Sequence, residues 1–232
     1  MKKIKRVKTY IKGFDELIQG GFPQGSNILL KGNPGTGKTI MSLNYLYNGA
    51  VNDGDVGVYF TFEERRESLI TQANLFGWDL EKLEKKGKIK IVSLGIDDID
   101  KNTVKDILDI IKNLKAKRVI IDSITTLSFL SPSCMEGKNF GIFDVKKFVY
   151  TFLTSFSNID EVTTLFISQK ENLKESTVAE YFCDGVVQIE YESMGGDFSR
   201  NLTINKMRKT KNDEDLHPLE ICDEGIIVHN LE

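Results

Sequence analysis

The stretch that decides the fold is Gly32-Asn33-Pro34-Gly35-Thr36-Gly37-Lys38-Thr39, which matches G-x-x-x-x-G-K-[ST] at every fixed position. The glycines allow backbone amides to turn inward around phosphate oxygens, and the Lys38 ammonium can reach the β- and γ-phosphates of a nucleotide. The Thr39 hydroxyl can ligate Mg²⁺, and a helix beginning here presents its positive end to the anion. We predict nucleotide contacts from Asn33, Pro34, Gly35, Thr36, Gly37, Lys38, Thr39 and Ile40.

The flanks of this loop have the context that a phosphate-binding loop requires. Residues 26–31 are typical of a strand, and residues 38–50 have the apolar spacing of a helix. Further along the chain, short apolar runs alternate with helical periodicities, and from Gly185 onward the pattern becomes strand-rich. Expected strands are 56–62, 89–93, 119–121, 163–168, 186–191, 202–207 and 226–228; expected helices are 67–76, 103–114 and 143–156; expected loops are 131–139 and 169–177. The pattern predicts an α/β fold, with a mostly parallel twisted sheet flanked by helices and C-terminal antiparallel strands.

Composition sets bounds on the class of protein. The 232 residues are 40% hydrophobic and 28% charged, which suits one domain over residues 1–232. No apolar run approaches the ~18 residues of a membrane span, so we expect a soluble protein without a membrane partner. The cysteines, Cys134, Cys183 and Cys222, form no metal-binding spacing and favour a reduced, cytoplasmic setting. A formal net charge of −3 argues against a generally basic nucleic-acid-binding surface.

Two further motifs accompany the phosphate loop. Residues 118–122, Arg-Val-Ile-Ile-Asp, have the form of a Walker B strand, and Asp122 at its carboxyl end would hold Mg²⁺, through water. Glu63 and Glu64 follow the expected strand 56–62 directly. If that strand lies beside the phosphate-loop strand, Glu63 could polarise the water that attacks the γ-phosphate. The alternative is a pair of surface acids that open a helix, where negative charge suits the helix dipole.

With these motifs and several further sequence blocks, the chain resembles the KaiC-like ATPases of the RecA/RadA superfamily, particularly the single-domain archaeal type. The blocks that carry the resemblance span nearly the whole sequence, and their order is more specific than any one motif. They are Gly13-Phe14-Asp15-Glu16-Leu17, Gly20-Gly21-Phe22-Pro23-Gln24-Gly25, the phosphate loop, Thr61-Phe62-Glu63-Glu64, Phe76-Gly77-Trp78-Asp79-Leu80, Ile121-Asp122-Ser123-Ile124-Thr125, Cys183-Asp184-Gly185-Val186-Val187 and Lys206-Met207-Arg208-Lys209-Thr210. The resemblance implies a RecA-like P-loop core.

The resemblance also implies a hexameric ring, a homo-oligomer with ATP or ADP and Mg²⁺ at the subunit interfaces. Glu63 would be the water-activating base, with Glu64 as its neighbour, and Lys206 and Arg208 would reach the nucleotide of the adjacent subunit. Cations delivered in this way offset the charge on the transferring phosphoryl group. From the residues alone, Lys206 and Arg208 belong to a basic run on a solvated face. Asn212 stands where family members commonly carry a His, which departs from the pattern of the family.

Three functions are compatible with these motifs. The leading hypothesis is an oligomeric, regulatory Mg²⁺-dependent ATPase. The second is a DNA-dependent, recombinase-like ATPase, with residues 128–140 and 169–181 lining a channel. Each of these segments carries at least as many acidic residues as lysines. They therefore lack the net positive charge that binding of DNA phosphates requires. The third is a scaffold that binds ATP and hardly hydrolyses it; the presence of Lys38, Glu63 and Asp122 together counts against it.

Overall fold

Apolar runs buried on both sides build the central sheet. In the Walker B strand, Val119 and Ile121 face one hydrophobic core, and Ile120 faces the other. In the phosphate-loop strand, Leu29 packs into the first of these cores, while Ile28 and Leu30 pack into the second. Because side chains alternate along a strand, these continuous apolar runs require helices on both faces of the sheet.

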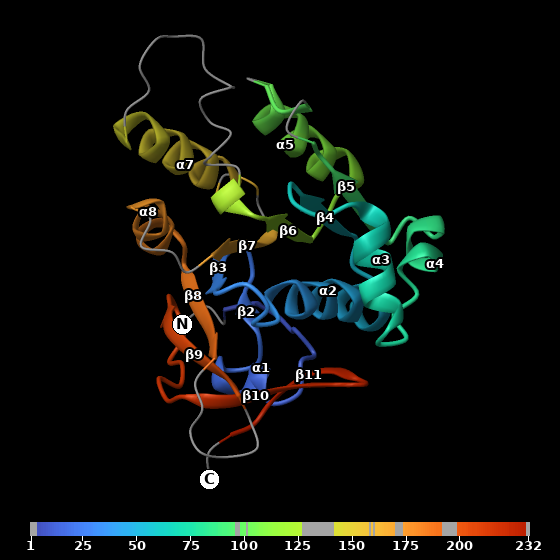
Figure 1. Cartoon of the computed structure of the whole chain (residues 1–232), viewed down its shortest axis with the longest axis vertical. Coiled ribbons are helices and arrows are strands. Elements are labelled where there is room, and N and C mark those ends of the chain that lie inside the picture. Colours follow the sequence, from blue (N-terminus) through green and yellow to red (C-terminus); the bar gives the residue numbers. More distant parts are fainter. Residues whose placement is uncertain are drawn as a thin grey trace.

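The computed structural model describes residues 4–95, 98–100, 102–126, 142–157, 159, 161–169, 174–191 and 199–230, with the backbone alone for 142–145 and 174–177. Within this part, a nine-stranded sheet has the order β11-β10-β9-β8-β3-β7-β6-β4-β5 (Figure 1). The parallel strands are β3 (Asn27–Gly32), β4 (Gly57–Thr61), β5 (Ile89–Ser93), β6 (Arg118–Asp122), β7 (Thr163–Gln169) and β8 (Gly185–Tyr191). Antiparallel strands β9 (Arg200–Met207), β10 (His217–Cys222) and β11 (Gly225–Val228) extend one edge. The predicted fold class is confirmed.

Helices cover the two faces of this sheet (Figure 1). One face carries α2 (Lys38–Asn48), α3 (Arg66–Asn74) and α4 (Leu80–Lys85). The other carries α5 (Thr103–Leu114), α7 (Ile142–Phe156) and α8 (Lys174–Phe182). A short N-terminal section adds β1 (Arg6–Val7), α1 (Phe14–Leu17) and β2 (Phe22–Pro23), with β1 and β2 paired antiparallel. No helix among the described residues has both the length and the apolar character needed to cross a membrane.

Some predicted boundaries were wrong. The helix expected over residues 38–50 ends at Asn48 and continues as a π-helix, η1 (Gly49–Asp53). Here the fully buried Arg118 donates hydrogen bonds to the Tyr45 carbonyl and to the Asp53 and Asp55 carboxylates. A Cβ at Gly49 would lie 2.0 Å from Arg118 Nε, so the guanidinium occupies the space beside the helix end.

The segment 169–177 was expected to be a loop, but α8 begins at Lys174 within it. Its first residues are polar and charged, so they carry no apolar periodicity; among its described side chains, Ala179 is buried. Helix α4 was also missed, although Asp79 caps it by accepting a hydrogen bond from the Lys82 amide at 2.9 Å. The predicted loop 131–139 and Cys134 lie outside the described residues.

Candidate functional site

The phosphate loop joins β3 to α2, as its sequence context predicted. Gly37 has φ +106°, a left-handed conformation that glycine adopts easily, and it directly precedes the first turn of α2. Gly32 lies so close to β8 that a Cβ would meet the Ile189 carbonyl oxygen at 2.3 Å. These two glycines let the chain leave the strand tightly and start the helix at Lys38, which directs the helix N-terminus toward the loop.

Lys38 is 8% exposed and lies inside the loop. Its Nζ donates hydrogen bonds to the carbonyl oxygens of Gly32 at 2.8 Å and Asn33 at 2.9 Å. Burial lowers the pKa of Lys38, whereas the charges of Asp122 and Glu63 raise it. The ammonium is therefore held where the loop would enclose phosphate, with two carboxylates near enough to influence it.

Asp122 and Thr39 bring oxygen atoms together at the carboxyl edge of the sheet. Asp122 is 5% exposed, and its Oδ2 lies 3.5 Å from Thr39 Oγ1. Carboxylate and hydroxyl oxygens are ligands that suit Mg²⁺, which also keeps waters and phosphate oxygens around it. Among the described residues there is no cluster of three or more His, Cys, Asp or Glu that would hold a metal by itself. The pair fits the predicted Mg²⁺ that binds together with a nucleotide.

Ionisation of the buried Asp122 carboxyl lowers the stability of the folded chain. Burial raises its pKa from 3.8 to about 6, and nearby Glu63 and Glu64 add to this, whereas a hydrogen bond from Tyr59 and the charge of Lys38 oppose it. A folded-state pKa above the unfolded value means that the folded chain binds this proton more tightly. The charged form therefore destabilises the fold, and the cost is complete above pH ~6, at about 3 kcal/mol.

We expect Asp122→Asn to stabilise the metal-free chain, because asparagine keeps the shape and loses the charge. The free energy of unfolding should rise by about 1–3 kcal/mol at pH 7.5 and change little at pH 4. Urea denaturation in EDTA at several pH values measures this difference between variant and wild type. It should grow between pH 4 and 6 and then stay constant; a difference that is independent of pH would contradict this account of Asp122.

The two glutamates point to different partners. Glu63 is exposed, and its Oε1 accepts hydrogen bonds from the hydroxyls of Ser123 and Thr126, just beyond β6. Glu64 turns to α3, where its Oε2 accepts hydrogen bonds from Ser68 Oγ at 2.7 Å and Gln72 Nε2 at 2.6 Å. Glu63 therefore belongs to the edge that carries Asp122, and Glu64 anchors the start of a helix.

The expected position of the strand before Glu63 needs a correction. Strand β4 does not lie beside β3, because β7 and β6 stand between them. It pairs instead with β6, and Thr61 lies opposite Asp122. The carboxyl ends of these parallel strands meet on one side of the sheet. Glu63 therefore lies near the Walker B carboxylate because β4 pairs with β6, and not because β4 lies beside β3.

Lys206 and Arg208 lie where the parallel strands begin, at the opposite end of these strands from the phosphate loop. Strand β9 runs antiparallel to β8, and its end, Met207, pairs with Gly185 at the start of β8. Gly185 in turn lies beside Ile28, near the start of β3, whereas the phosphate loop follows the end of β3. The separation is about 15 Å, the length of the β3 ladder. The two cations are thus remote from the phosphate loop of their own chain.

Within the chain, both cations contact the end of α8. Lys206 Nζ donates hydrogen bonds to the carbonyl oxygens of Glu180, Tyr181 and Cys183 at 2.9, 3.2 and 2.6 Å. Carbonyls at a helix C-terminus carry partial negative charge, so an ammonium is a suitable cap. Arg208 is held less firmly: its side chain is 51% exposed, with the Asp184 carboxylate at 3.4 Å. The sequence placed this pair on a solvated face and did not reveal the capping role.

We expect Lys206→Met to lower the melting temperature by about 2–6 °C, because it removes a charged cap from α8. The capping contacts lie within one chain, so the shift should be present in nucleotide-free protein at low protein concentration. Differential scanning calorimetry measures it. Lys209→Met is the matched control, because Lys209 is an exposed neighbour of this pair. The melting temperature of this variant should equal that of wild type. Equal stability of all three proteins would contradict the capping role.

One contact of the phosphate loop was not predicted from the sequence. The hydroxyl of Tyr191, at the end of β8, donates a hydrogen bond to the Gly35 carbonyl at 2.6 Å. Arg200 donates to the same hydroxyl at 2.9 Å, and its guanidinium lies over the ring at 4.9 Å from the centroid. The antiparallel extension of the sheet therefore supports the outer side of the loop. No local sequence signal marks this contact, because it depends on how β8 aligns with β3.

Comparisons with known proteins agree with the fold, and the fold with its phosphate loop defines a RecA-like P-loop nucleotide-binding protein. A family model described as "ATPase: KaiC" matches residues 7–232. The chain belongs to this KaiC family of ATPases. The KaiC-like protein PH0186 of Pyrococcus horikoshii has a solved structure that superposes with a TM-score of 0.85 at 34% identity, covering 98% of this chain and 100% of that one.

Curated relatives carry a less specific description. A UPF0273 protein of Sulfurisphaera tokodaii is 35% identical over 97% of this chain and 83% of its own length. Another, from Thermotoga maritima, is 34% identical over 99% of this chain and 98% of its own length. These matches, which cover nearly all of this chain, confirm the predicted resemblance to the single-domain archaeal type, and the family supports ATP binding.

Proposed function

We propose that this chain is a Mg²⁺-dependent ATPase that hydrolyses ATP at interfaces between identical chains. The observation that carries the proposal is the division of the predicted machinery between two edges of one sheet. Lys38, Thr39, Asp122 and Glu63 gather at the carboxyl edge, and Lys206 and Arg208 lie at the other.

In this proposal, residues 33–40 enclose the phosphates, and Lys38 neutralises the β- and γ-phosphate oxygens. Thr39 and Asp122 would hold Mg²⁺, which supplies further positive charge to the phosphate oxygens when it is bound. Glu63 orients a water and accepts its proton, and the hydroxyls of Ser123 and Thr126 fix the carboxylate for this task. Glu64 positions the start of α3 beside it.

The placement of Arg208 supports an assembly of identical chains. A side chain ~15 Å from its own phosphate loop cannot stabilise charge there, but it can reach the loop of a neighbouring copy. Such head-to-tail contacts close into a ring when the rotation between copies allows it, and we infer a hexamer from the family resemblance. Hydrolysis would then depend on assembly, since each site takes its arginine from the next chain.

The recombinase-like alternative requires a basic surface for nucleic acid. The predicted channel segment 169–181 contains Glu180, which forms an ion pair with Lys31 of the same chain at 2.8 Å. The segment 127–141 lies outside the described residues. A scaffold that binds ATP without turnover would not need a carboxylate held beside the Walker B aspartate, which favours the enzyme.

The test is the rate of ATP hydrolysis per chain in Mg²⁺ as protein concentration increases, with and without single-stranded DNA. An interface ATPase should become faster per chain as assembly proceeds and should not respond to DNA. Strong stimulation by DNA would favour the recombinase-like function. Tight ATP binding without phosphate release at any concentration would leave the scaffold.

A further inference from the structure

Tyr59 is a fully buried residue in the middle of β4 that carries a polar group into the core. Its hydroxyl donates a hydrogen bond to Asp122 Oδ2 at 2.5 Å, the same oxygen that lies 3.5 Å from Thr39 Oγ1. A phenol from one strand and a hydroxyl from the phosphate-loop helix thus converge on one carboxylate oxygen. No motif in the sequence assigns Tyr59 a role.

The strand register explains this contact. Strands β4 and β6 are parallel, with Thr61 opposite Asp122 and Tyr59 opposite Ile120. Tyr59 is therefore two positions before the residue opposite Asp122 and on the same face of the sheet. The long aromatic side chain spans this diagonal, and its hydroxyl meets the Asp122 carboxylate. A phenylalanine would pack in the same place, so the hydroxyl alone makes the contact.

The Tyr59 hydroxyl is the donor in this contact, because an ionised carboxylate oxygen can only accept a hydrogen bond. Burial raises the pKa of Tyr59 well above 10, and the Asp122 charge raises it further. Donation to a carboxylate favours its ionised form, and for Asp122 it opposes the effect of burial. A hydrogen bond to a charged acceptor in a site shielded from water is among the stronger ones in proteins. Its loss would leave a buried carboxylate oxygen without this donor.

We propose that Tyr59 is a positioning residue, whose hydroxyl holds the Asp122 carboxylate turned toward Thr39 and thereby sets the Mg²⁺ affinity of the nucleotide site. The proposal rests on the proposed function, because it assigns the Thr39–Asp122 pair to Mg²⁺. It goes beyond that function by tying the metal requirement to a buried residue that lies outside the nucleotide-binding motifs.

The test compares Tyr59→Phe with wild type in the binding of a fluorescent ADP analogue, titrated with Mg²⁺. Affinity in EDTA should be unchanged, because the phosphate loop is intact. The Mg²⁺ concentration that gives half of the metal-dependent gain in affinity should rise by about tenfold. Tyr45→Phe is a matched control: Tyr45 is also fully buried, and its hydroxyl has no hydrogen-bond partner among the described residues. Its Mg²⁺ midpoint should equal that of wild type.

The outcomes separate the inference from the function on which it rests. A wild type that depends on Mg²⁺, with an equal midpoint in Tyr59→Phe, would overturn the role of Tyr59 and leave the proposed function standing. A wild type whose nucleotide affinity ignores Mg²⁺ would overturn both. A similar midpoint shift in Tyr45→Phe would show that any buried hydroxyl in this core has the effect, and the specific role of Tyr59 would fall.

Discussion

Glu63→Gln should bind Mg²⁺-ATP as wild type does and hydrolyse it about 10²–10⁴-fold more slowly, because an amide cannot accept the proton of the attacking water. The glutamine carbonyl can still accept the hydrogen bonds from Ser123 and Thr126, so the local structure should persist. A filter-binding assay gives ATP affinity, and phosphate release gives the rate, both on the same preparation.

Glu64→Gln is the matched control for this variant. Glu64 is the adjacent acid, but its carboxylate accepts hydrogen bonds from Ser68 and Gln72 in α3. We therefore expect a rate within a few-fold of wild type and a small loss of stability. A reversed result, with Glu64→Gln slow and Glu63→Gln unaffected, would contradict the assignment of Glu63 as the base.

Arg208→Ala should reduce the hydrolysis rate of the assembled protein by about 10³-fold or more, since an arginine delivered from a neighbour is worth that much in related phosphoryl transfer. The side chain is half exposed, with one ion pair at 3.4 Å, so the stability of the single chain should change by less than ~1 kcal/mol. Light scattering checks assembly, and phosphate release checks the rate. Lys209→Ala, which removes the next cation along the chain, should retain activity. An assembled Arg208→Ala protein with an unchanged rate would contradict the role in trans.

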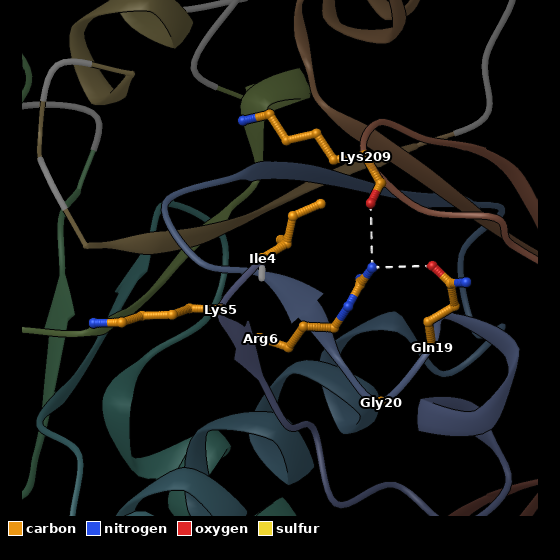
Figure 2. A pocket seen from close by; sticks show the side chains of 6 residues that line it. All are labelled: Ile4, Lys5, Arg6, Gln19, Gly20 and Lys209. Carbon is orange, nitrogen blue, oxygen red and sulfur yellow. Dashed lines mark hydrogen bonds between the residues drawn. The ribbon is translucent and has the colours of Figure 1, made fainter. Parts of the chain in front are cut away.

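The backbone next to Arg208 is held by a contact that does not involve the Arg208 side chain. The Arg208→Ala substitution should therefore leave this backbone in place. Arg6 donates hydrogen bonds to the Lys209 carbonyl at 3.2 Å and the Gln19 side chain at 3.1 Å. Figure 2 shows these two bonds at the edge of a hollow of about 740 Å³, with the Lys5 and Lys209 side chains extending away from Arg6. The turn after β9 should therefore keep its place when the Arg208 side chain is removed.

What the sequence predicted well was local. The phosphate loop needs its glycines, Lys38 and Thr39 at fixed spacing, and Asp122 ends a continuous apolar strand, so each motif could be read within a few residues. The alternation of apolar strands with helices was enough for the fold class. Helix α8 was partly missed because its first residues are polar and charged, so they give no apolar periodicity.

What the sequence did not predict depends on which strands are neighbours. Strand β4 lies beside β6, and only this order brings Glu63 and the Tyr59 hydroxyl to Asp122. The cap that Lys206 forms on α8 also joins segments that are far apart in the chain. Sequence periodicity carries no information on these pairings, because a strand has the same pattern beside any partner.

The most direct test of interface catalysis mixes two inactive variants, Glu63→Gln and Arg208→Ala, and measures phosphate release after they have co-assembled. The proposal predicts recovered activity, because some interfaces then join an intact Glu63 site to an intact Arg208 from the neighbour. With equal amounts and random mixing, roughly a quarter of the interfaces are complete in this way. Recovery to that fraction of the wild-type rate would support catalysis between chains. Mixed assemblies that remain as slow as either variant alone would contradict it.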